Sequence, residues 1–274
     1  MSTPSPSDPA RAVVIGGGAA GLMAAEALAR AGHHVTVLER MPSLGRRLLM
    51  AGRGGLNITH TEPMGDFLTR YGPEAGWLAP VIERFGPQAI RDWCAGLGIE
   101  TFAGSSGRVF PVAMKASPLL RAWVRRLDGL GVVFRLGAEW RGFRDTGILV
   151  AGPQGEEVIP ADAAVLACGG ATWPRLGADG NWVARLGEAV TPFAPANGGF
   201  AVPWSGVFAE RFAGTPLKGV AFAVDDVTAR GEGVVTNEGL EGGGIYAVSR
   251  ALRAALAAGD ATLVIDLKPD TDTA

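Results

Sequence analysis

Cysteine is scarce in this sequence, with two residues, Cys94 and Cys168, in a chain of 274. Two isolated cysteines make neither a CxxC pair nor a disulfide framework, so dithiol redox chemistry is disfavoured. Cys168 closes the apolar run over residues 163–167, and Cys94 lies within a helical pattern. We therefore predict that both are core thiols and that residues 163–167 form a buried strand. The sequence contains no cluster of ligands that predicts a metal site.

Long apolar runs and basic clusters are also absent. No run reaches the roughly 20 apolar residues of a transmembrane helix, because Glu26 and Arg30 interrupt the apolar stretch that begins at Ala12. The formal net charge is −2, and lysine occurs only at positions 115, 218 and 268. This balance argues against nucleic acid or a membrane as the main partner. We expect a cytoplasmic protein whose partner is a small-molecule substrate, and the sequence leaves its oligomeric state open.

Glycine and proline, by contrast, are abundant. The chain has 41 glycines and 18 prolines, which together make up about a fifth of its residues. In an average protein the two make up roughly 12%. No collagen-like period accompanies them, so they indicate tight turns and places where the backbone approaches a ligand. Hydrophobic residues make up 47% of the chain, which permits a sizeable buried core. The length suggests one large domain or two modest ones, and the polar, proline-rich residues 1–10 are expected to be disordered.

The first structured segment has the pattern of a strand, a glycine turn, a helix and a second strand. Residues 12–15 are Ala-Val-Val-Ile, Gly16–Gly21 is the turn, and residues 18–31 are rich in alanine and leucine. Gly32 ends the helical pattern, and the second strand follows over residues 35–38. Such a βαβ unit predicts a parallel sheet.

The turn reads Gly-Gly-Gly-Ala-Ala-Gly, which fits the dinucleotide-binding pattern GxGxxG between a strand and a helix. Gly16 permits the tight turn, Gly18 lets the backbone approach a pyrophosphate, and Gly21 lets the helix pack closely on the sheet. The helix N-terminus offers N–H donors to phosphates. Glu39 ends the second strand, where a carboxylate binds ribose hydroxyls and repels a 2′-phosphate. This context predicts dinucleotide binding, disfavours NADP, and does not separate FAD from NAD.

The composition changes near residues 191–197. Beyond them the predicted strands are short, alternate in polarity and are separated by glycine and aspartate turns. A helix over residues 245–258 and a strand over residues 262–267 close the chain. We therefore predict a domain boundary here, with one domain over residues 11–191 and a β-rich one over residues 192–274.

Five stretches together carry a family resemblance: Val14–Gly21, Gly45–Thr59, Gly107–Pro118, Val165–Gly180 and Gly233–Ser249. They resemble bacterial flavoproteins of the NAD(P)/FAD-dependent oxidoreductase family that includes aminoacetone oxidase and bile-acid reductase. The resemblance covers nearly the whole chain after residue 11. It implies an α/β fold in which a Rossmann-like parallel sheet binds FAD and a β-rich insert domain interrupts it near residue 192.

The resemblance also implies which residues hold FAD. The glycine turn would bind the pyrophosphate, the end of the second strand the adenosine ribose, and the segment after it the ribityl chain and flavin ring. A later strand would offer backbone groups to the adenine, and a second pair of glycines would pass close to the cofactor. The predicted cofactor-binding residues are Gly16, Gly18, Ala19, Ala20, Gly21, Glu39, Arg40, Arg46, Arg47, Gly52, Asn57, Trp140, Gly169, Gly170 and Asp179.

Two departures from the family pattern bear on function. Many relatives carry Gly-Gly-Gly-Arg-Cys-Asn where Gly52–Asn57 of this chain reads Gly-Arg-Gly-Gly-Leu-Asn. Leu56 replaces the cysteine and the arginine is displaced to Arg53, so redox chemistry through that cysteine is excluded. The sequence also lacks the late glycine-rich element with which relatives complete the FAD domain. We therefore expect a fragment of a longer protein, or an incomplete flavin site, with both domains cut short.

The resulting hypothesis is an FAD-dependent oxidoreductase that acts on a small organic substrate, with NAD(P)H as a transient co-substrate and electron donor. Two alternatives stay open: an NAD-dependent dehydrogenase built on the same βαβ unit, and a non-catalytic flavin-binding module. No catalytic acid or base is identified. A structural or solvent-exposed role is favoured over a catalytic one for each side chain considered: His60, Arg53, Tyr246 and Asn237.

Overall fold

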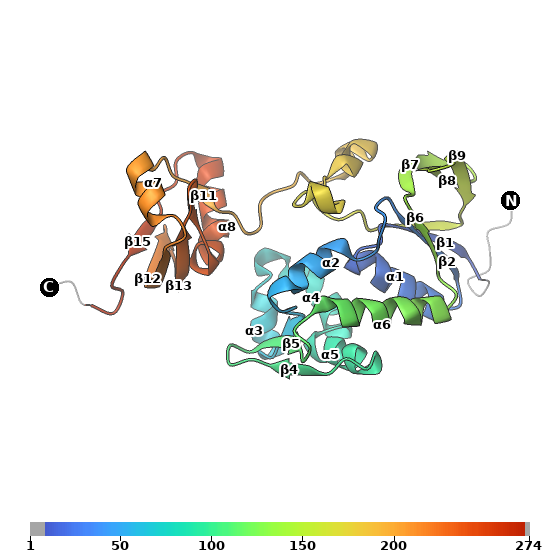
Figure 1. Cartoon of the computed structure of the whole chain (residues 1–274), viewed down its shortest axis with the longest axis horizontal. Helices are drawn as coiled ribbons and strands as arrows, with labels where there is room; N and C mark the ends of the chain where they lie inside the picture. The colour runs from blue at the N-terminus through green and yellow to red at the C-terminus, as the bar shows by residue number, and fades with distance from the viewer. Residues whose placement is uncertain (1–8, 272–274) are drawn as a thin grey trace. The chain divides into compact units, whose positions relative to one another are not determined.

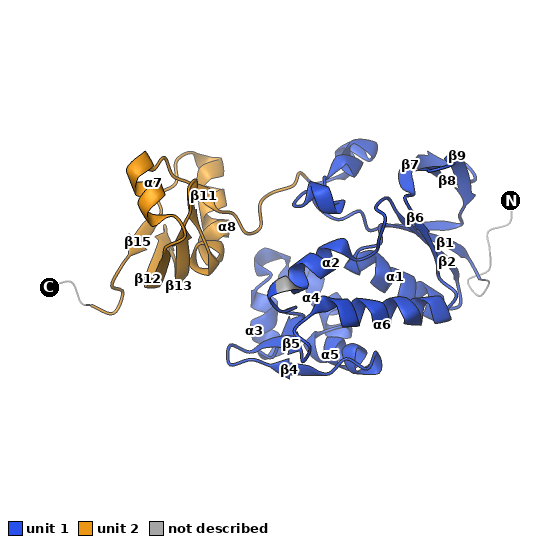
Figure 2. Cartoon of the chain, in the orientation of Figure 1, with its two compact units in different colours: residues 1–191 blue, residues 192–274 orange. Residues whose placement is uncertain are grey.

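The computed structural model describes residues 9–271, with residues 1–8 and 272–274 outside that range. The chain divides into two compact units, residues 1–191 and 192–274 (Figure 2). Each unit has its own sheet and its own hydrophobic core. No helix in the part of the chain that the structure describes is long and apolar enough to cross a membrane.

The N-terminal stretch expected to be disordered falls mostly on residues 1–8, which lie outside the described residues. Its last residue, Ala10, is held in place. The N–H of Ala10 donates to Nδ1 of His33 at 3.2 Å, and the carbonyl oxygen of Ala10 accepts from the N–H of His34 at 3.0 Å. The ordered domain therefore includes this residue.

A four-stranded parallel sheet forms the centre of the first unit, in the order β10-β1-β2-β6 (Figure 1). β1 is buried from Ala12 to Ile15, as suits a strand covered on both faces. The glycine turn and α1 follow it directly. The predicted α/β fold with a Rossmann-like parallel sheet is confirmed. The bounds are Arg11–Ile15 for β1, Ala19–Arg30 for α1, His34–Glu39 for β2, Val133–Leu136 for β6 and Ala163–Leu166 for β10.

Each face of this sheet is covered by a layer of its own. Successive side chains of a strand point to opposite faces, so the apolar residues of β1 and β2 contact both layers. On one face, Leu22 of α1 and Trp123 of α6 pack with Val14. On the other face, Trp140 of a small antiparallel sheet, β7-β8-β9, packs with Leu38. Full burial of each such side chain stabilises the fold by about 1.5–3 kcal/mol. The bounds are Ala116–Gly129 for α6, Glu139–Arg144 for β7, Gly147–Gly152 for β8 and Gly155–Pro160 for β9.

β10 corrects one expectation, that residues 163–167 form a buried strand. Among the described strands β10 pairs with β1 alone, so it is an edge of the sheet, and three of its four residues are exposed. An all-apolar run does not distinguish a central strand from an edge strand. Cys168, just beyond β10, is only half-buried, whereas Cys94 is confirmed as a core thiol, with no exposed surface.

Between β2 and α6 the chain forms short helices and a three-stranded sheet in the order β3-β5-β4. Residues 75–96 contain two helices instead of one, because Gly86 interrupts the helical pattern and Pro87 begins the second helix. α6 begins at Ala116, after Lys115 in an extended conformation. The bounds are Arg46–Ala51 for α2, Gly52–Gly54 for η1, Thr59–His60 for β3, Met64–Thr69 for α3, Gly72–Glu74 for η2, Ala75–Arg84 for α4, Pro87–Gly96 for α5, Thr101–Ala103 for β4 and Arg108–Pro111 for β5.

A buried carboxylate joins α1 to α5 and α6. Glu26 of α1 accepts hydrogen bonds from Nε1 of Trp93 at 3.0 Å and Nε1 of Trp123 at 2.8 Å. It also forms ion pairs with Arg30 at 2.9 Å and Arg126 at 3.1 Å. Burial raises the pKa of this carboxyl, but the hydrogen bonds from Trp93, Arg30 and Arg126 outweigh burial and bring the pKa below its usual range. The charged group thus holds three helices together behind the glycine turn.

The second unit is an antiparallel sheet in the order β11-β14-β13-β12-β15, with α8 packed on one face. Phe222 of β12 and Ile245 of α8 are fully buried in its core. A Cβ on Gly231 would lie 2.9 Å from the Cα of Gly244, so this glycine pair lets α8 approach β13 closely. The bounds are Phe200–Ala201 for β11, Gly206–Phe212 for α7, Pro216–Val224 for β12, Val227–Val235 for β13, Gly239–Glu241 for β14, Gly243–Ala258 for α8 and Val264–Asp266 for β15.

Candidate functional site

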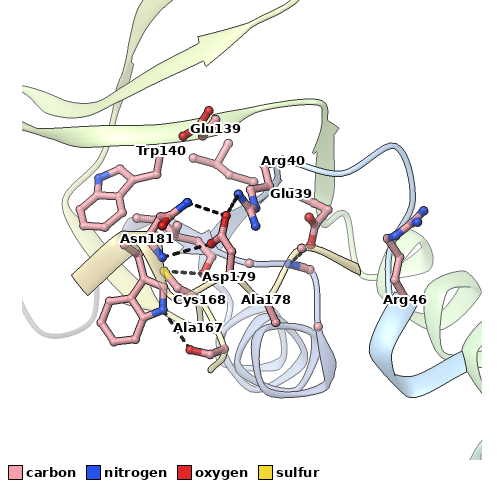
Figure 3. A pocket seen from close by; sticks show the side chains of 18 of the residues that line it. Glu39, Arg40, Arg46, Glu139, Trp140, Ala167, Cys168, Ala178, Asp179 and Asn181 are labelled. Atoms are coloured by element: carbon pink, nitrogen blue, oxygen red, sulfur yellow. Dashed lines mark hydrogen bonds and ion pairs between the residues drawn. The ribbon is translucent and has the colours of Figure 1, made fainter. Parts of the chain in front are cut away.

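A cavity of the first unit opens at the carboxyl ends of β1, β2 and β10 (Figure 3). Its empty space is about 820 Å³, counted with the solvent in its open mouth. The carboxyl ends of parallel strands are where open α/β sheets bind their ligands. The cavity brings together most of the predicted cofactor-binding residues: Gly16, Gly18, Glu39, Arg40, Arg46, Arg47, Trp140, Gly169 and Asp179.

The glycines of the turn differ in what requires them. A Cβ on Gly21 would lie 1.8 Å from the carbonyl oxygen of Gly16, and a Cβ on Gly16 would lie 2.3 Å from the carbonyl oxygen of Ala167. Gly16 also has a φ of +114°, which residues with a side chain rarely adopt. A Cβ on Gly18 would meet no protein atom within 4 Å, and its φ of −83° suits any residue. The packing of the protein therefore explains Gly16 and Gly21 but not Gly18.

Gly18 is also the N-cap of α1, and no side chain caps this end of the helix. The first N–H groups of an α-helix have no partner within the helix, and they carry a partial positive charge. Ala19 and Ala20 are exposed in the first turn, but they do not line the cavity. What α1 can offer a ligand is its backbone N–H groups, which suit an anion.

Glu39 lies at the end of β2 and holds the turn in place. Its Oε2 accepts a hydrogen bond from the N–H of Gly17 at 2.9 Å, and its Oε1 accepts one from the N–H of Met41 at 2.8 Å. Each carboxylate oxygen has a second acceptor site. Glu39 can therefore hold the glycine turn and still accept hydrogen bonds from the hydroxyls of a ribose.

Two arginines of α2 bring positive charge to the cavity. Nη1 of Arg46 donates to Oγ of Ser43 at 3.3 Å, while the buried Nε of Arg46 has no hydrogen-bond partner. Within residues 9–271, no carboxylate forms an ion pair with Arg46 or Arg47. A buried donor without an acceptor costs roughly 1–3 kcal/mol. Because both arginines line the cavity without a carboxylate partner among these residues, the site suits an anionic ligand.

Residues 176–185 form another side of the cavity, which we call the distal wall. Its Asp179 forms an ion pair with Arg40 at 2.8 Å, and it also accepts hydrogen bonds from the backbone N–H of Asn181 at 3.1 Å and from its Nδ2 at 2.8 Å (Figure 3). Burial raises the pKa of the Asp179 carboxyl, but the bonds from Arg40 and Asn181 bring it below its usual range. The wall thus carries a charged group that faces the end of β2.

Two further contacts hold the distal wall, in which η4 spans Asn181–Arg185. Nε1 of Trp182 donates to the carbonyl oxygen of Gly169 at 3.0 Å. Arg185 pairs with Glu139 at 3.1 Å, and its guanidinium lies 5.9 Å from the centre of the Trp140 ring. Both contacts join the wall to the Rossmann-like core through partly exposed side chains. The neighbouring 3-10 helices are η3, Pro174–Leu176, and η5, Gly187–Ala189.

Several predicted cofactor-binding residues do not line the cavity, and two of them have packing or hydrogen-bond roles within the protein. A Cβ on Gly52 would lie 2.5 Å from the Cβ of Ala116, so Gly52 lets the chain pass close to α6. Nδ2 of Asn57 donates to the carbonyl oxygen of Thr59 at 2.8 Å and to that of Val109 at 3.2 Å. The predicted residues that do not line the cavity are Ala19, Ala20, Gly21, Gly52, Asn57 and Gly170.

The cavity also contains residues that the sequence did not point to. Gly17 and Glu139 are neighbours of predicted residues, so a wider window around each motif includes them. Cys168 was expected in the core, and its exposure follows from the edge position of β10. Trp182 and Arg185 belong to a short 3-10 helix with no motif of its own, so no sequence signal indicates them.

His60 lies at a separate small hollow, together with Glu62 and Arg91. Its Nε2 is 2.9 Å from the carbonyl oxygen of Ser106, so Nε2 carries the proton and donates. Its Nδ1 accepts from the N–H of Glu62 at 3.1 Å. Both ring nitrogens are bound to backbone groups, which supports a structural role for His60.

Three known proteins illustrate the similarities of this chain. A 3-dehydro-bile acid delta(4,6)-reductase of Clostridium scindens is 30% identical over 189 residues, which cover 67% of this chain and 45% of that protein. A D-amino acid dehydrogenase of Dechloromonas aromatica is 43% identical over 53 residues, which cover 19% and 13%. The crystal structure of a 3-ketosteroid-delta4-(5alpha)-dehydrogenase from Rhodococcus jostii is 20% identical, with a TM-score of 0.44 and coverage of 59% of this chain and 46% of that one.

The chain spans less than half the length of the two curated relatives. The match to a bile-acid reductase agrees with the resemblance that the five sequence stretches indicated. Residues 10–260, nearly the whole chain, match the family described as HI0933-like protein Rossmann domain. The chain therefore belongs to the HI0933-like protein Rossmann domain family.

Proposed function

We propose that this chain is the cofactor-binding part of an FAD-dependent oxidoreductase that acts on a small organic substrate, with NAD(P)H as its transient electron donor. Membership in a Rossmann-domain family supports a dinucleotide ligand. Relatives named as a reductase and a dehydrogenase support redox chemistry. When bound, the flavin supplies the electron transfer, while the protein binds and orients it.

The open space beside Gly18 is the observation that carries the proposal. It lines the cavity, it adopts a backbone conformation open to any residue, and its missing side chain would meet no protein atom within 4 Å. Neither the packing nor the backbone conformation of the described residues therefore requires a glycine at this position. A pyrophosphate at the N-terminus of α1 provides a reason for one, because its oxygens need to approach the backbone closely.

The charges of the cavity support the same ligand. Arg46 and Arg47 line the cavity and have no ion-pair partner among the described residues, so a pyrophosphate would supply the negative charge that their guanidinium groups lack. Glu39, at the end of β2, would accept hydrogen bonds from the adenosine ribose with the acceptor sites that Gly17 and Met41 leave open. These features suit the ADP half that FAD and NAD share, and the family resemblance favours FAD. An NAD-dependent dehydrogenase is the second candidate.

The visible spectrum of the purified chain tests the proposal. FAD is added in excess, free FAD is removed by gel filtration, and the absorbance of the protein peak is recorded. We expect flavin-shaped absorbance that travels with the protein. A colourless protein that binds NAD in calorimetry would favour the dehydrogenase, and a protein that binds neither would refute a dinucleotide site in this chain.

Gly18→Val tests the position of the pyrophosphate. The added side chain occupies the open space of the cavity, so we expect the variant to fold like the wild type and to lose FAD. Gly129→Val is the matched control, because a Cβ on Gly129 also meets no atom within 4 Å and Gly129 lies outside the cavity. Full FAD occupancy in Gly18→Val would show that the pyrophosphate binds elsewhere.

A further inference from the structure

The end of β2 places two opposite charges side by side in the cavity. Glu39 and Arg40 are consecutive residues, and both line it (Figure 3). In dinucleotide-binding folds, an acidic residue at this position binds a free ribose 2′-hydroxyl, whereas a nearby arginine accommodates a 2′-phosphate. This cavity holds both residue types. Whether the cavity prefers a 2′-hydroxyl or a 2′-phosphate therefore depends on whether the Arg40 guanidinium is available to the ligand.

Asp179 forms an ion pair with that guanidinium. It comes from the distal wall, 139 residues along the chain from Arg40, and it binds Nη1 of Arg40 at 2.8 Å. Two hydrogen bonds from Asn181 hold the Asp179 carboxylate in this position. The side chains of Arg40 and Asp179 are 31% and 22% exposed, so the pair is partly shielded from water and stronger than a fully exposed one.

We propose that Asp179 determines the nucleotide specificity of the site: by holding the Arg40 guanidinium, it withholds that group from a 2′-phosphate and so favours adenine dinucleotides with a free 2′-hydroxyl. This inference rests on the proposed function. A phosphate monoester carries a charge of about −1.5 to −2 at neutral pH. Beside Arg40 it would meet two carboxylates, those of Glu39 and Asp179, with one guanidinium between them. FAD, which has a free 2′-hydroxyl, is accepted, and the abundant 2′-phosphorylated nucleotides are rejected.

The other arginines of the cavity do not replace Arg40 in this role. Arg185 is paired with Glu139, and Arg46 lies apart from the Arg40–Asp179 pair, on the far side of Glu39 (Figure 3). Arg46 and Arg47 are the charges assigned above to the pyrophosphate. The discrimination at the ribose therefore falls to Glu39, Arg40 and Asp179.

Calorimetric titration with ADP-ribose and with 2′-phospho-ADP-ribose tests the inference, because the two ligands differ only in the 2′-phosphate. We expect the wild type to bind ADP-ribose at least about tenfold more tightly, and Asp179→Asn to reduce that ratio about tenfold, the effect of one charge-assisted contact. Asp179→Ser is the second variant, should Asp179→Asn fail to fold. Adding Arg40→Met to Asp179→Asn should restore the wild-type ratio, because the tighter binding of 2′-phospho-ADP-ribose by Asp179→Asn depends on the Arg40 guanidinium.

Asp162→Asn is the matched control. It removes an aspartate that pairs with Arg11 at 2.6 Å outside the cavity, so the ratio of affinities should not change. A wild type that binds both ligands equally, or variants of Asp179 that keep the wild-type ratio, would overturn the inference while leaving the nucleotide site intact. A wild type that binds neither ligand would overturn the proposed function and the inference with it.

Discussion

The glycine turn and the distal wall line the same cavity but are held in place by different forces. In the turn, backbone atoms of Gly16 and Gly21 are in close contact, and Glu39 binds the N–H of Gly17 directly. The distal wall depends on side-chain contacts such as Asp179–Arg40, whose members are partly exposed to water. Close backbone packing resists any added atom, whereas a partly shielded ion pair tolerates a change of one side chain at a smaller cost. The turn is therefore the side of the site where a substitution is expected to cost most, and the distal wall the side where it is expected to cost least.

The largest effect is expected where the turn itself is broken. Gly21→Ala puts a Cβ 1.8 Å from the carbonyl oxygen of Gly16, so α1 must move away from the turn. We expect the free energy of unfolding to fall by about 3 kcal/mol or more. Urea unfolding followed by circular dichroism measures this. Gly18→Ala is the control and should unfold like the wild type, and equal midpoints for all three proteins would contradict the packing argument.

The next largest loss of stability is expected at Glu26, which joins α1 to α5 and α6. Glu26→Gln removes the buried carboxylate that pairs with the largely buried Arg126 and with the more exposed Arg30, and we expect a loss of about 2–4 kcal/mol of stability at neutral pH. Asp162→Asn, which removes a surface ion pair, should change stability little. If both variants unfolded alike, the buried network would not be what anchors α1.

The pH dependence of that effect follows from the lowered pKa of Glu26. When the folded pKa lies below the unfolded one, the carboxylate contributes its full stability above the unfolded pKa and loses it as the pH falls through the folded pKa. The difference in unfolding free energy between the wild type and Glu26→Gln should therefore shrink in acid. Urea titrations at a series of pH values measure it, and a difference that stayed constant would refute the charged state of Glu26.

The smallest effect is expected in the distal wall. Trp182→Phe removes the N–H that donates to Gly169, worth about 1 kcal/mol. We expect FAD to dissociate a few-fold faster and the free energy of unfolding to fall by no more than about 1 kcal/mol. Trp77→Phe is the matched control, because the Trp77 indole donates to Glu74 on an exposed helix outside the cavity. Equal dissociation rates in both variants would mean that the wall does not retain the cofactor.

The sequence patterns indicated the local parts of this cavity, and the family resemblance added the distant residues Trp140, Gly169 and Asp179, which also line it. The βαβ unit, Glu39 and the α/β fold follow from residues close together in the chain, and the structure brings Gly16, Gly18 and Glu39 to one cavity. The predicted burial of residues 163–167 was wrong, because composition does not reveal whether a strand has one neighbour or two. Arg185 was not predicted, because no motif near it in the sequence indicates that it lines a site.

By itself, the sequence determined the order of elements, the glycine turn and the acidic residue that ends β2. These depend on backbone geometry and on side-chain periodicity, both of which act over a few residues. Only the tertiary structure decided that Asp179 meets Arg40 across 139 residues of chain, and that Gly18, unlike Gly16 and Gly21, has open space where a side chain would be. Such contacts form because the parallel strands of a sheet end at one edge, where distant segments converge.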